Sequence, residues 1–362
     1  MFWWSLVCLA VLPAAYPQDL LICGGYDVRA LRIENGTVST LWTWNATNSN
    51  LPESLKGAFV TTSECKPCPG GKVLVTSSGG GAGPGAVAFV DPVTATVSFY
   101  ASAVNAHSAD LLPGNRVVVA LSYETNGNRI AVFDLATPNV EILTTPLWGA
   151  HGVVWDEQRQ ILWGLSDSFI AGYKLTNWNS QPDLVQVSWT GLPDGGGHDM
   201  YSVPNSPFLM VATALHGWLF DRDARTFTKH PLLGDIPNIK ATAVHPDTRQ
   251  IVYVTSDGPY WSEHLRFLSP SNTVDFPGDH LYKARWIGAE PAPRLSIART
   301  GTNTTLVAWP ARWTNFTLQQ SGIPDPTNWD VPGESIGDDG VNKFITITPT
   351  NQRFYRLFKT SP

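Results

Sequence analysis

The sequence predicts an all-β protein, a β-propeller of six blades followed by a small C-terminal β-sandwich. Three observations predict it. A segment of about 44 residues recurs along the chain, which is close to the length of one four-stranded blade. The composition, with 31 Gly, 28 Pro and only 15% charged residues, suits short strands joined by tight turns. From about residue 291 the repeat gives way to a different set of short strands.

The repeat is clearest in three segments that each open with a small residue and a histidine. They are AHSADLLPGNRVVVALS (106–122), AHGVVWDEQRQILWGLS (150–166) and GHDMYSVPNSPFLMVAT (197–213). In each segment an apolar run ends in Ser or Thr fifteen residues after the histidine. His107, His151 and His198 therefore occupy equivalent positions of successive repeats.

Three further copies place other polar residues at the histidine position. The candidates are Ser63 or Glu64 in the first copy, Lys240 or Ala241 in the fifth, and Lys283 or Arg285 in the sixth. The six copies start near residues 63, 107, 151, 198, 240 and 283, which favours six blades.

The sixth copy, LYKARWIG (281–288), has an opening strand and nothing after it. The N-terminal LLICGG (20–25) lacks an opening strand, so we expect the two to pair and close the ring. A seventh blade is expected only if a degenerate copy occupies residues 45–62 or the chain after 289.

Residues 1–18 form an apolar run that ends in small residues, which predicts a secretory signal peptide, with a short N-terminal anchor as the alternative. No later stretch is long and apolar enough to span a bilayer. Four N-glycosylation sequons fit a secreted glycoprotein, at Asn35, Asn45, Asn303 and Asn315. We therefore expect an extracellular protein in which residues 19–290 form the propeller and residues 291–362 the sandwich.

The net charge of −6 argues against a basic surface for nucleic acid or anionic membrane. We expect a monomer that binds no nucleic acid and has no membrane span once the signal is removed.

After signal removal three cysteines remain, Cys23, Cys65 and Cys68, and we expect a structural disulfide or inert thiols, because a single C-x-x-C is weak evidence for zinc. The Gly-rich segment 79–85 lacks the Lys-Ser/Thr and the helix of a phosphate loop, so a turn is expected there.

The last segment contains period-2 strands, TLVAW, FTLQQS, KFITITP and RFYRLF, separated by Pro, Asp and Gly turns. In its order FTLQQS … NW … FYRL it resembles the short C-terminal β modules of secreted, polysaccharide-associated bacterial proteins. It carries no catalytic motif, and its binding role stays open.

The repeat also predicts a site. In a propeller the first strand of each blade lines the central channel, so equivalent residues form a ring. Three consecutive blades contribute His107, His151 and His198, and the ring also contains cationic candidates. Titratable groups clustered in a cleft are typical of functional sites. Two chemistries fit: the three imidazoles could hold a divalent transition metal, or one could be a general base while Lys and Arg bind an anionic substrate.

The whole chain is similar to a family of uncharacterised secreted propeller proteins, through AHSADLLPGNRVVVA, GAHGVVWD followed by ILWGL, GGHDMYSVP and KATAVHP. In architecture it resembles the propeller polysaccharide lyases, which include oligogalacturonate, ulvan and rhamnose-glucuronate lyases. Those enzymes keep His, Arg and Tyr, and in some cases a His-bound metal, over the channel mouth. The six repeats depart from their usual seven blades, and no lyase motif matches residue by residue, so the activity is implied by analogy alone.

The lyase analogy implies β-elimination on an acidic, uronate-containing polysaccharide or oligosaccharide. A base must remove the C5 proton, a cation must neutralise the carboxylate, and the leaving oxygen needs a proton. We expect His107 to be the base and His151 and His198 to position substrate or bind metal. The other expected site residues are Tyr201 as proton donor, Lys240 and Arg285 on the carboxylate, and Glu64 and Lys283 as further substrate contacts.

A non-catalytic propeller that binds a glycan or a protein is the alternative from a different functional class. Glycoside hydrolysis is less favoured, because the ring offers only Glu64, Asp110 and Asp199 and no obvious opposed pair of carboxylates.

Overall fold

The computed structural model describes residues 18–34, 37–80, 83–92, 94–288, 293, 295–300, 303–311, 313, 316–323, 328–339, 342–348 and 351–359. The predicted signal peptide and the sequons at Asn35 and Asn315 lie outside these ranges, apart from Gln18, with which β1 begins. The described chain is almost entirely strand and turn. Its helical elements are η1 (Ala46–Asn48), α1 (Glu53–Lys56) and η2 (Pro69–Gly71). Within the described ranges no helix has the length and apolar character needed to cross a membrane.

Five four-stranded antiparallel sheets are each built from consecutive strands and form blades 1 to 5. Blade 1 is β4 (Thr62–Pro67), β5 (Val73–Ser77), β6 (Ala86–Asp91) and β7 (Thr96–Ser102), and blade 2 is β8 (Ala106–Leu112), β9 (Arg116–Leu121), β10 (Arg129–Asp134) and β11 (Glu141–Pro146). Blade 3 is β12 (Gly152–Asp156), β13 (Ile161–Leu165), β14 (Phe169–Thr176) and β15 (Asp183–Gly191), and blade 4 is β16 (Asp199–Ser202), β17 (Phe208–Ala212), β18 (Gly217–Asp221) and β19 (Thr226–Lys229). Blade 5 is β20 (Ile239–Val244), β21 (Ile251–Thr255), β22 (His264–Leu268) and β23 (Asn272–Asp275).

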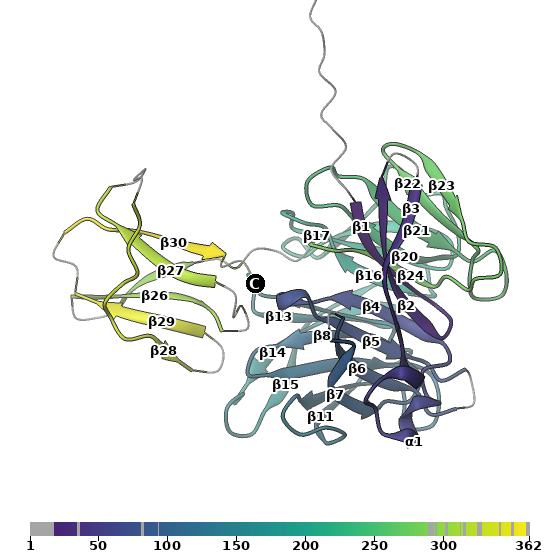
Figure 1. Ribbon diagram of the computed structural model, residues 1–362, viewed down its shortest axis with the longest axis horizontal. Coiled ribbons are helices and arrows are strands. Elements are labelled where there is room, and N and C mark those ends of the chain that lie inside the picture. Colours follow the sequence, from purple (N-terminus) through teal and green to yellow (C-terminus); the bar gives the residue numbers. More distant parts are fainter. Residues whose placement is uncertain are drawn as a thin grey trace, which may run out of the picture.

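The sixth blade closes the ring with strands from two distant parts of the chain. Its strands, in order from the channel, are β24 (Lys283–Trp286), β1 (Gln18–Cys23), β2 (Asp27–Glu34) and β3 (Thr37–Asn45). Leu20 pairs with Trp286 and Cys23 with Lys283, antiparallel, and Figure 1 shows β1 and β24 on the same side of the ring. The predicted pairing of segment 281–288 with the N-terminal segment 20–25 is confirmed.

The β-propeller fold is therefore confirmed, with six blades. The segment 45–62, where a degenerate blade was considered, begins with the last residue of β3 and ends with the first of β4, and between them it contains only short helical elements and turns. The innermost strands β4, β8, β12, β16, β20 and β24 each contact the next around the ring, and β24 contacts β4. Six blades thus complete the circle.

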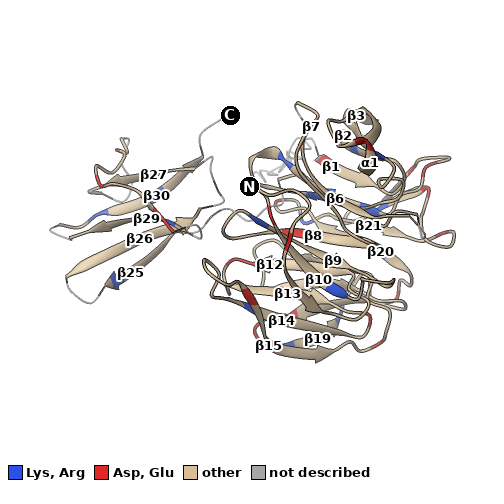
Figure 2. Cartoon of the chain, turned by 90° about the horizontal axis from the view of Figure 1, so that it is seen from below, with Lys and Arg blue, Asp and Glu red and all other residues tan. Residues whose placement is uncertain are grey.

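Apolar cores lie between neighbouring blades, because both faces of each sheet are covered. One core joins Val118 and Ala120 of blade 2 to Val153 and Trp155 of blade 3. In the view of Figure 2, the Lys and Arg positions and the Asp and Glu positions are short, scattered segments of a mostly uncharged chain. The sheets therefore form a rigid, mostly apolar frame around the channel.

The C-terminal segment forms two facing sheets. The first contains β25 (Ser296–Thr300), β26 (Thr304–Pro310), β29 (Asn342–Ile347) and β28 (Gly337–Asp338), and the second contains β27 (Phe316–Ser321) and β30 (Phe354–Lys359). Val307, Trp309, Leu318 and Ile345 form the core between them. Figure 1 shows β26 to β30 grouped apart from the blades. The predicted sandwich is confirmed; the boundary at 290/291 lies outside the described residues and stays a prediction.

Candidate functional site at the channel mouth

The three repeat histidines meet at one end of the channel. The ring centroids of His107 and His151 lie 4.5 Å apart with planes tilted by 37°, and those of His151 and His198 lie 5.6 Å apart, edge to face. Each histidine immediately precedes the paired part of its innermost strand or is an extra residue within it. The sequence repeat therefore translates directly into a cluster of imidazoles.

Strand register identifies the equivalent residues of the other three blades. Ser63, His107 and Lys240 are each an extra residue at a register shift of the innermost strand, between paired neighbours on both sides. Tyr282 donates its backbone N–H to Cys23, as His151 does to Leu165. The six positions form what we call the mouth ring: Ser63, His107, His151, His198, Lys240 and Tyr282.

Tyr282 is the ring member that the sequence analysis missed. We aligned the sixth blade on Lys283 or Arg285, which lie one and three residues deeper along the channel. The signal was present in the sequence, because Tyr282 directly precedes Lys283 as His198 directly precedes Asp199. The Tyr282 hydroxyl lies 3.3 Å from His107 Nδ1, across the position of the small Ser63.

His107 uses both ring nitrogens, because Nδ1 faces Tyr282 and Nε2 lies 3.0 Å from the Asn105 side-chain oxygen. Burial lowers the pKa of His107 well below its ordinary value, and the neighbouring His151 lowers it further. His107 is therefore a neutral imidazole held in one orientation at neutral pH.

The other two imidazoles are neutral as well. His151 Nδ1 lies 2.8 Å from the Gly149 carbonyl oxygen and 3.2 Å from the Ser122 hydroxyl. Burial lowers the pKa of His151 to about 4. For His198, burial and then the Lys240 charge lower the pKa to about 3, and its buried Nδ1 has no hydrogen-bond partner in the structure.

Lys240 is the cation of the mouth ring. Its side chain is 5% exposed, yet none of its hydrogen bonds or ion pairs in the described structure involves the ammonium. Burial, with the Lys283 charge nearby, lowers the pKa of Lys240 to about 8. An ammonium of this kind lacks a counter-ion, which is costly inside a protein unless a ligand supplies one.

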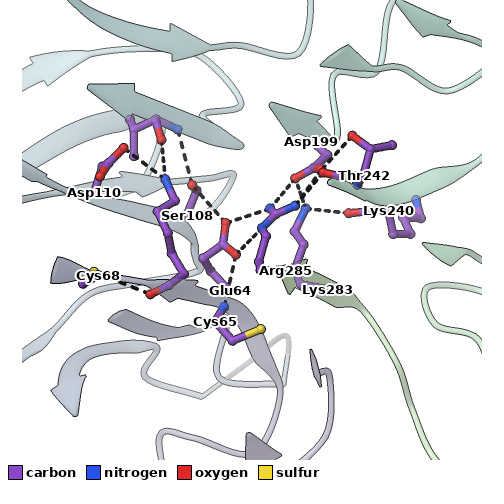
Figure 3. Close-up of polar contacts among 12 residues, drawn as sticks. Glu64, Cys65, Cys68, Ser108, Asp110, Asp199, Lys240, Thr242, Lys283 and Arg285 are labelled. Carbon is purple, nitrogen blue, oxygen red and sulfur yellow. Dashed lines mark hydrogen bonds and ion pairs between the residues drawn. The ribbon is translucent and has the colours of Figure 1, made fainter. Parts of the chain in front are cut away.

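One to three residues deeper along the channel, the charged side chains neutralise one another. Arg285, Glu64, Asp199 and Lys283 form what we call the ionic network, and each is at most 2% exposed. The Arg285 guanidinium donates to both Glu64 oxygens at 2.9 Å and to Asp199 at 2.7 Å (Figure 3). The Lys283 ammonium donates to Asp199 at 2.8 Å and to the Lys240 and His198 carbonyl oxygens.

The ionic network corrects three sequence assignments. Glu64, Lys283 and Arg285 were expected to bind substrate, but their charges are buried and already paired. Burial alone would raise the pKa of Asp199, yet the charges of Arg285 and Lys283 outweigh it and hold that pKa well below its ordinary value. The charges of these side chains cancel one another beneath the mouth ring, so the side chains are not available to bind a substrate.

Tyr201 also lies in the deeper part of the channel. It is three residues beyond His198, about 10 Å along a strand. Its ring centroid is 4.3 Å from the Arg285 guanidinium carbon and 5.8 Å from the Lys66 ammonium. Tyr201 therefore packs under the ionic network, whereas the Tyr282 hydroxyl lies at the mouth beside His107.

The three imidazoles do not fit a metal site. Among the described residues, no group of three or more His, Cys, Asp or Glu side chains is arranged to hold a metal ion. Metal ligation needs a free ring lone pair directed at a common point. Here His107 and His151 stack, and both nitrogens of His107 already have partners.

The three described cysteines are buried, reduced thiols. Burial, together with a hydrogen bond to Cys23, raises the pKa of the Cys65 thiol well above its ordinary value. Cys68 donates to the Lys66 carbonyl oxygen at 3.5 Å. All three pack in the blade cores, and the Cys23 carbonyl oxygen also accepts the backbone N–H of Tyr282.

Comparisons with known proteins agree with the fold and are silent on chemistry. The sequence model of a "Family of unknown function (DUF6528)" matches residues 15–291. No curated protein matches the sequence. A propeller chain from a "Crystal structure of Nidogen/Laminin Complex" is similar with a TM-score of 0.52 at 13% identity, and the alignment covers 75% of this chain and 99% of that chain. At this identity the likeness shows the fold alone, and nothing in the comparisons supports the resemblance to polysaccharide lyases.

Proposed function

This chain belongs to DUF6528, a family of unknown function, and we propose that it is a secreted polysaccharide lyase. The channel mouth would bind a uronate-containing glycan and cleave it by β-elimination. The observation that carries the proposal is the unpaired Lys240 ammonium, which is buried among three neutral imidazoles.

A carboxylate is the ligand that the mouth ring lacks. The ring has one cation and no acid, while every carboxylate of the ionic network beneath it is paired. A uronate carboxylate next to Lys240 would supply the missing counter-ion in a buried site, where the pair is less screened by solvent than in water. Neutral His151 and His198 can exchange hydrogen bonds with sugar hydroxyls without adding charge.

The pair formed by His107 and Tyr282 supplies the acid and base groups. When the Tyr282 hydroxyl turns from His107 to the leaving oxygen, Nδ1 of His107 has a free lone pair and accepts the C5 proton. The C4–O bond breaks as the C4–C5 double bond forms, and the Tyr282 hydroxyl protonates the leaving oxygen. His107 then returns its proton to Tyr282 across the 3.3 Å contact, which restores both groups. A bound carboxylate favours protonated imidazole, so it raises the low pKa of His107 toward the range that a base requires.

Absorbance tests this activity. The purified protein is incubated with oligogalacturonates, oligoglucuronates and ulvan, and the unsaturated product is followed at about 235 nm, where the conjugated double bond formed by elimination absorbs. Activity is expected on at least one substrate and is lost in Lys240→Met and His107→Ala. Lys229→Met is the matched control, because Lys229 pairs with the exposed Asp235 on blade 4. Full activity in His107→Ala contradicts the mechanism.

Glycan binding without cleavage is the second candidate, and one observation favours it. The low pKa values of all three imidazoles make them weak bases in the free protein. Calorimetric binding of an oligouronate that depends on Lys240, with no absorbance change, would support this candidate over the lyase.

A further inference from the structure

Exposed apolar side chains gather on one end of the propeller. The loops that lead into the innermost strands, and those that join the second strand of a blade to the third, lie at the mouth end. They carry Tyr26, Tyr123, Trp148, Leu215, Leu232 and Tyr260, which are 38–65% exposed. Among the described loops at the opposite end of the blades, Val140 is the one exposed large apolar residue. The mouth ring is therefore surrounded by apolar side chains, and the other end is not.

Two of these side chains are continuous with the mouth ring. The Tyr123 ring lies 5.9 Å from His151, and the Trp148 ring packs edge to face on Tyr123 at 5.9 Å with an interplanar angle of 83°. Trp148 is 61% exposed, so its indole face is open to solvent. A continuous series of ring contacts thus leads from His151 at the channel mouth through Tyr123 to the exposed Trp148.

The aromatic pair is held in place by its surroundings. The backbone oxygen of Trp148 accepts the Ser166 hydroxyl at 2.7 Å and the Asp167 N–H at 3.3 Å. Gly149 has a φ of +57°, and a Cβ there would lie 2.8 Å from the Tyr123 hydroxyl. A non-glycine residue at 149 would therefore push Tyr123 away, so this turn keeps the two rings together.

We propose that Trp148 and Tyr123 form a subsite that stacks a pyranose ring of the same glycan, next to the sugar whose carboxylate meets Lys240. This inference rests on the proposed glycan ligand and names how the second sugar is held. An aromatic ring presents a flat apolar face, and the C–H face of a pyranose packs on it while its hydroxyls stay in water. The mouth ring itself is polar and suits the charged sugar.

The subsite predicts that affinity rises with chain length through Trp148. Calorimetry measures the binding of mono-, di- and tetrasaccharides of galacturonate, glucuronate and mannuronate to wild type and Trp148→Ala. The tetrasaccharide is expected to bind the variant about tenfold more weakly, a loss within the range of aromatic contacts, while the monosaccharide is unaffected. Trp148→Phe, which retains a ring, is expected to recover most of the affinity.

Trp189→Ala is the matched control, because Trp189 is 60% exposed on β15, the outermost strand of blade 3. It should leave both affinities unchanged. Equal tetrasaccharide affinity in wild type and Trp148→Ala overturns the subsite, as does a wild type whose affinity does not rise with length on any of the three series. Failure of elimination alone, with the Trp148 dependence intact, removes the lyase activity and keeps the subsite.

Discussion

Lys240 and Lys283 lie one residue apart in depth in the same channel and are almost equally buried, at 5% and 1% exposure. Lys283 donates to Asp199 and to two backbone carbonyl oxygens, whereas the Lys240 ammonium has no partner among the described residues. A buried charge that has its counter-ion, such as Lys283, favours one arrangement of the strands. A buried charge without a counter-ion, such as Lys240, is available to pair with a ligand. The ionic network and the mouth ring therefore have different roles, although the network residues lie on β4, β16 and β24, which also contribute to the mouth ring or directly follow its residues.

The ionic network also explains how the ring closes. Lys283 and Arg285 lie on β24, and their partners Glu64 and Asp199 lie on blades 1 and 4. A slip of β24 by one residue would turn its side chains away from the channel and leave the carboxylates buried without partners. The network thus selects the register of the strand that completes the propeller.

The largest expected effect is on the ionic network. Arg285→Met leaves Glu64 and Asp199 buried without their guanidinium, so the free energy of unfolding should fall by about 3–5 kcal/mol. Urea denaturation followed by circular dichroism measures it. Arg129→Met is the control, because Arg129 makes a similar two-bond pair with Glu141 on the surface of blade 2. Arg129→Met should lower the free energy of unfolding by about 1 kcal/mol or less. Equal losses in the two variants would contradict the idea that the ionic network stabilises the fold more than a surface ion pair does.

The second prediction concerns the histidines and pH. The pKa of His151 is about 4 in the folded chain against an ordinary 6.5, so the unfolded chain binds its proton more readily between these values. Stability should therefore fall as pH falls from 6.5 to 4, by on the order of 3 kcal/mol for this group. Thermal unfolding measured across that range should show a smaller decrease in His151→Gln. An identical decrease in wild type and His151→Gln would contradict the prediction.

Third, Lys240→Met should stabilise the protein while it removes ligand binding. The folded pKa of about 8 lies below the ordinary 10.5, so wild type carries a penalty below pH 8 that is relieved as pH rises toward 10.5. At pH 7 the variant should gain on the order of 1–3 kcal/mol, and the gain should disappear above about pH 10.5. Chemical denaturation at pH 7 and pH 10.5 tests it; a loss of stability at pH 7 would show that Lys240 has a structural partner.

The smallest effect on stability, about 1 kcal/mol, is expected for Tyr282→Phe, because one partly buried hydroxyl is lost. Its effect on elimination should be large, about 100-fold or more, if the hydroxyl transfers a proton. Tyr201→Phe, which changes the tyrosine under Arg285, should leave the elimination rate close to wild type. A reversed order of the two variants would return the proton-donor role to Tyr201.

The sequence alone determined the propeller, the closure by β1 and β24, and the meeting of three histidines. These follow from a strict period, because residues at one position of a repeat occupy one level of a ring. The same reasoning predicted the C-terminal sandwich from alternating strands. The local sequence pattern was sufficient to predict the elements that recur from blade to blade.

Only the tertiary structure decided which charges are free. His198 and Tyr282 each precede a charged residue in the sequence, and nothing local shows that Asp199 meets Lys283 and Arg285 across the channel. The ion pairs join residues 84 positions or more apart, such as Lys283 with Asp199 and Arg285 with Glu64. Pairing across the ring neutralised Glu64, Lys283 and Arg285, whereas the predicted Lys240 has no partner among the described residues and Tyr282 joins the mouth ring.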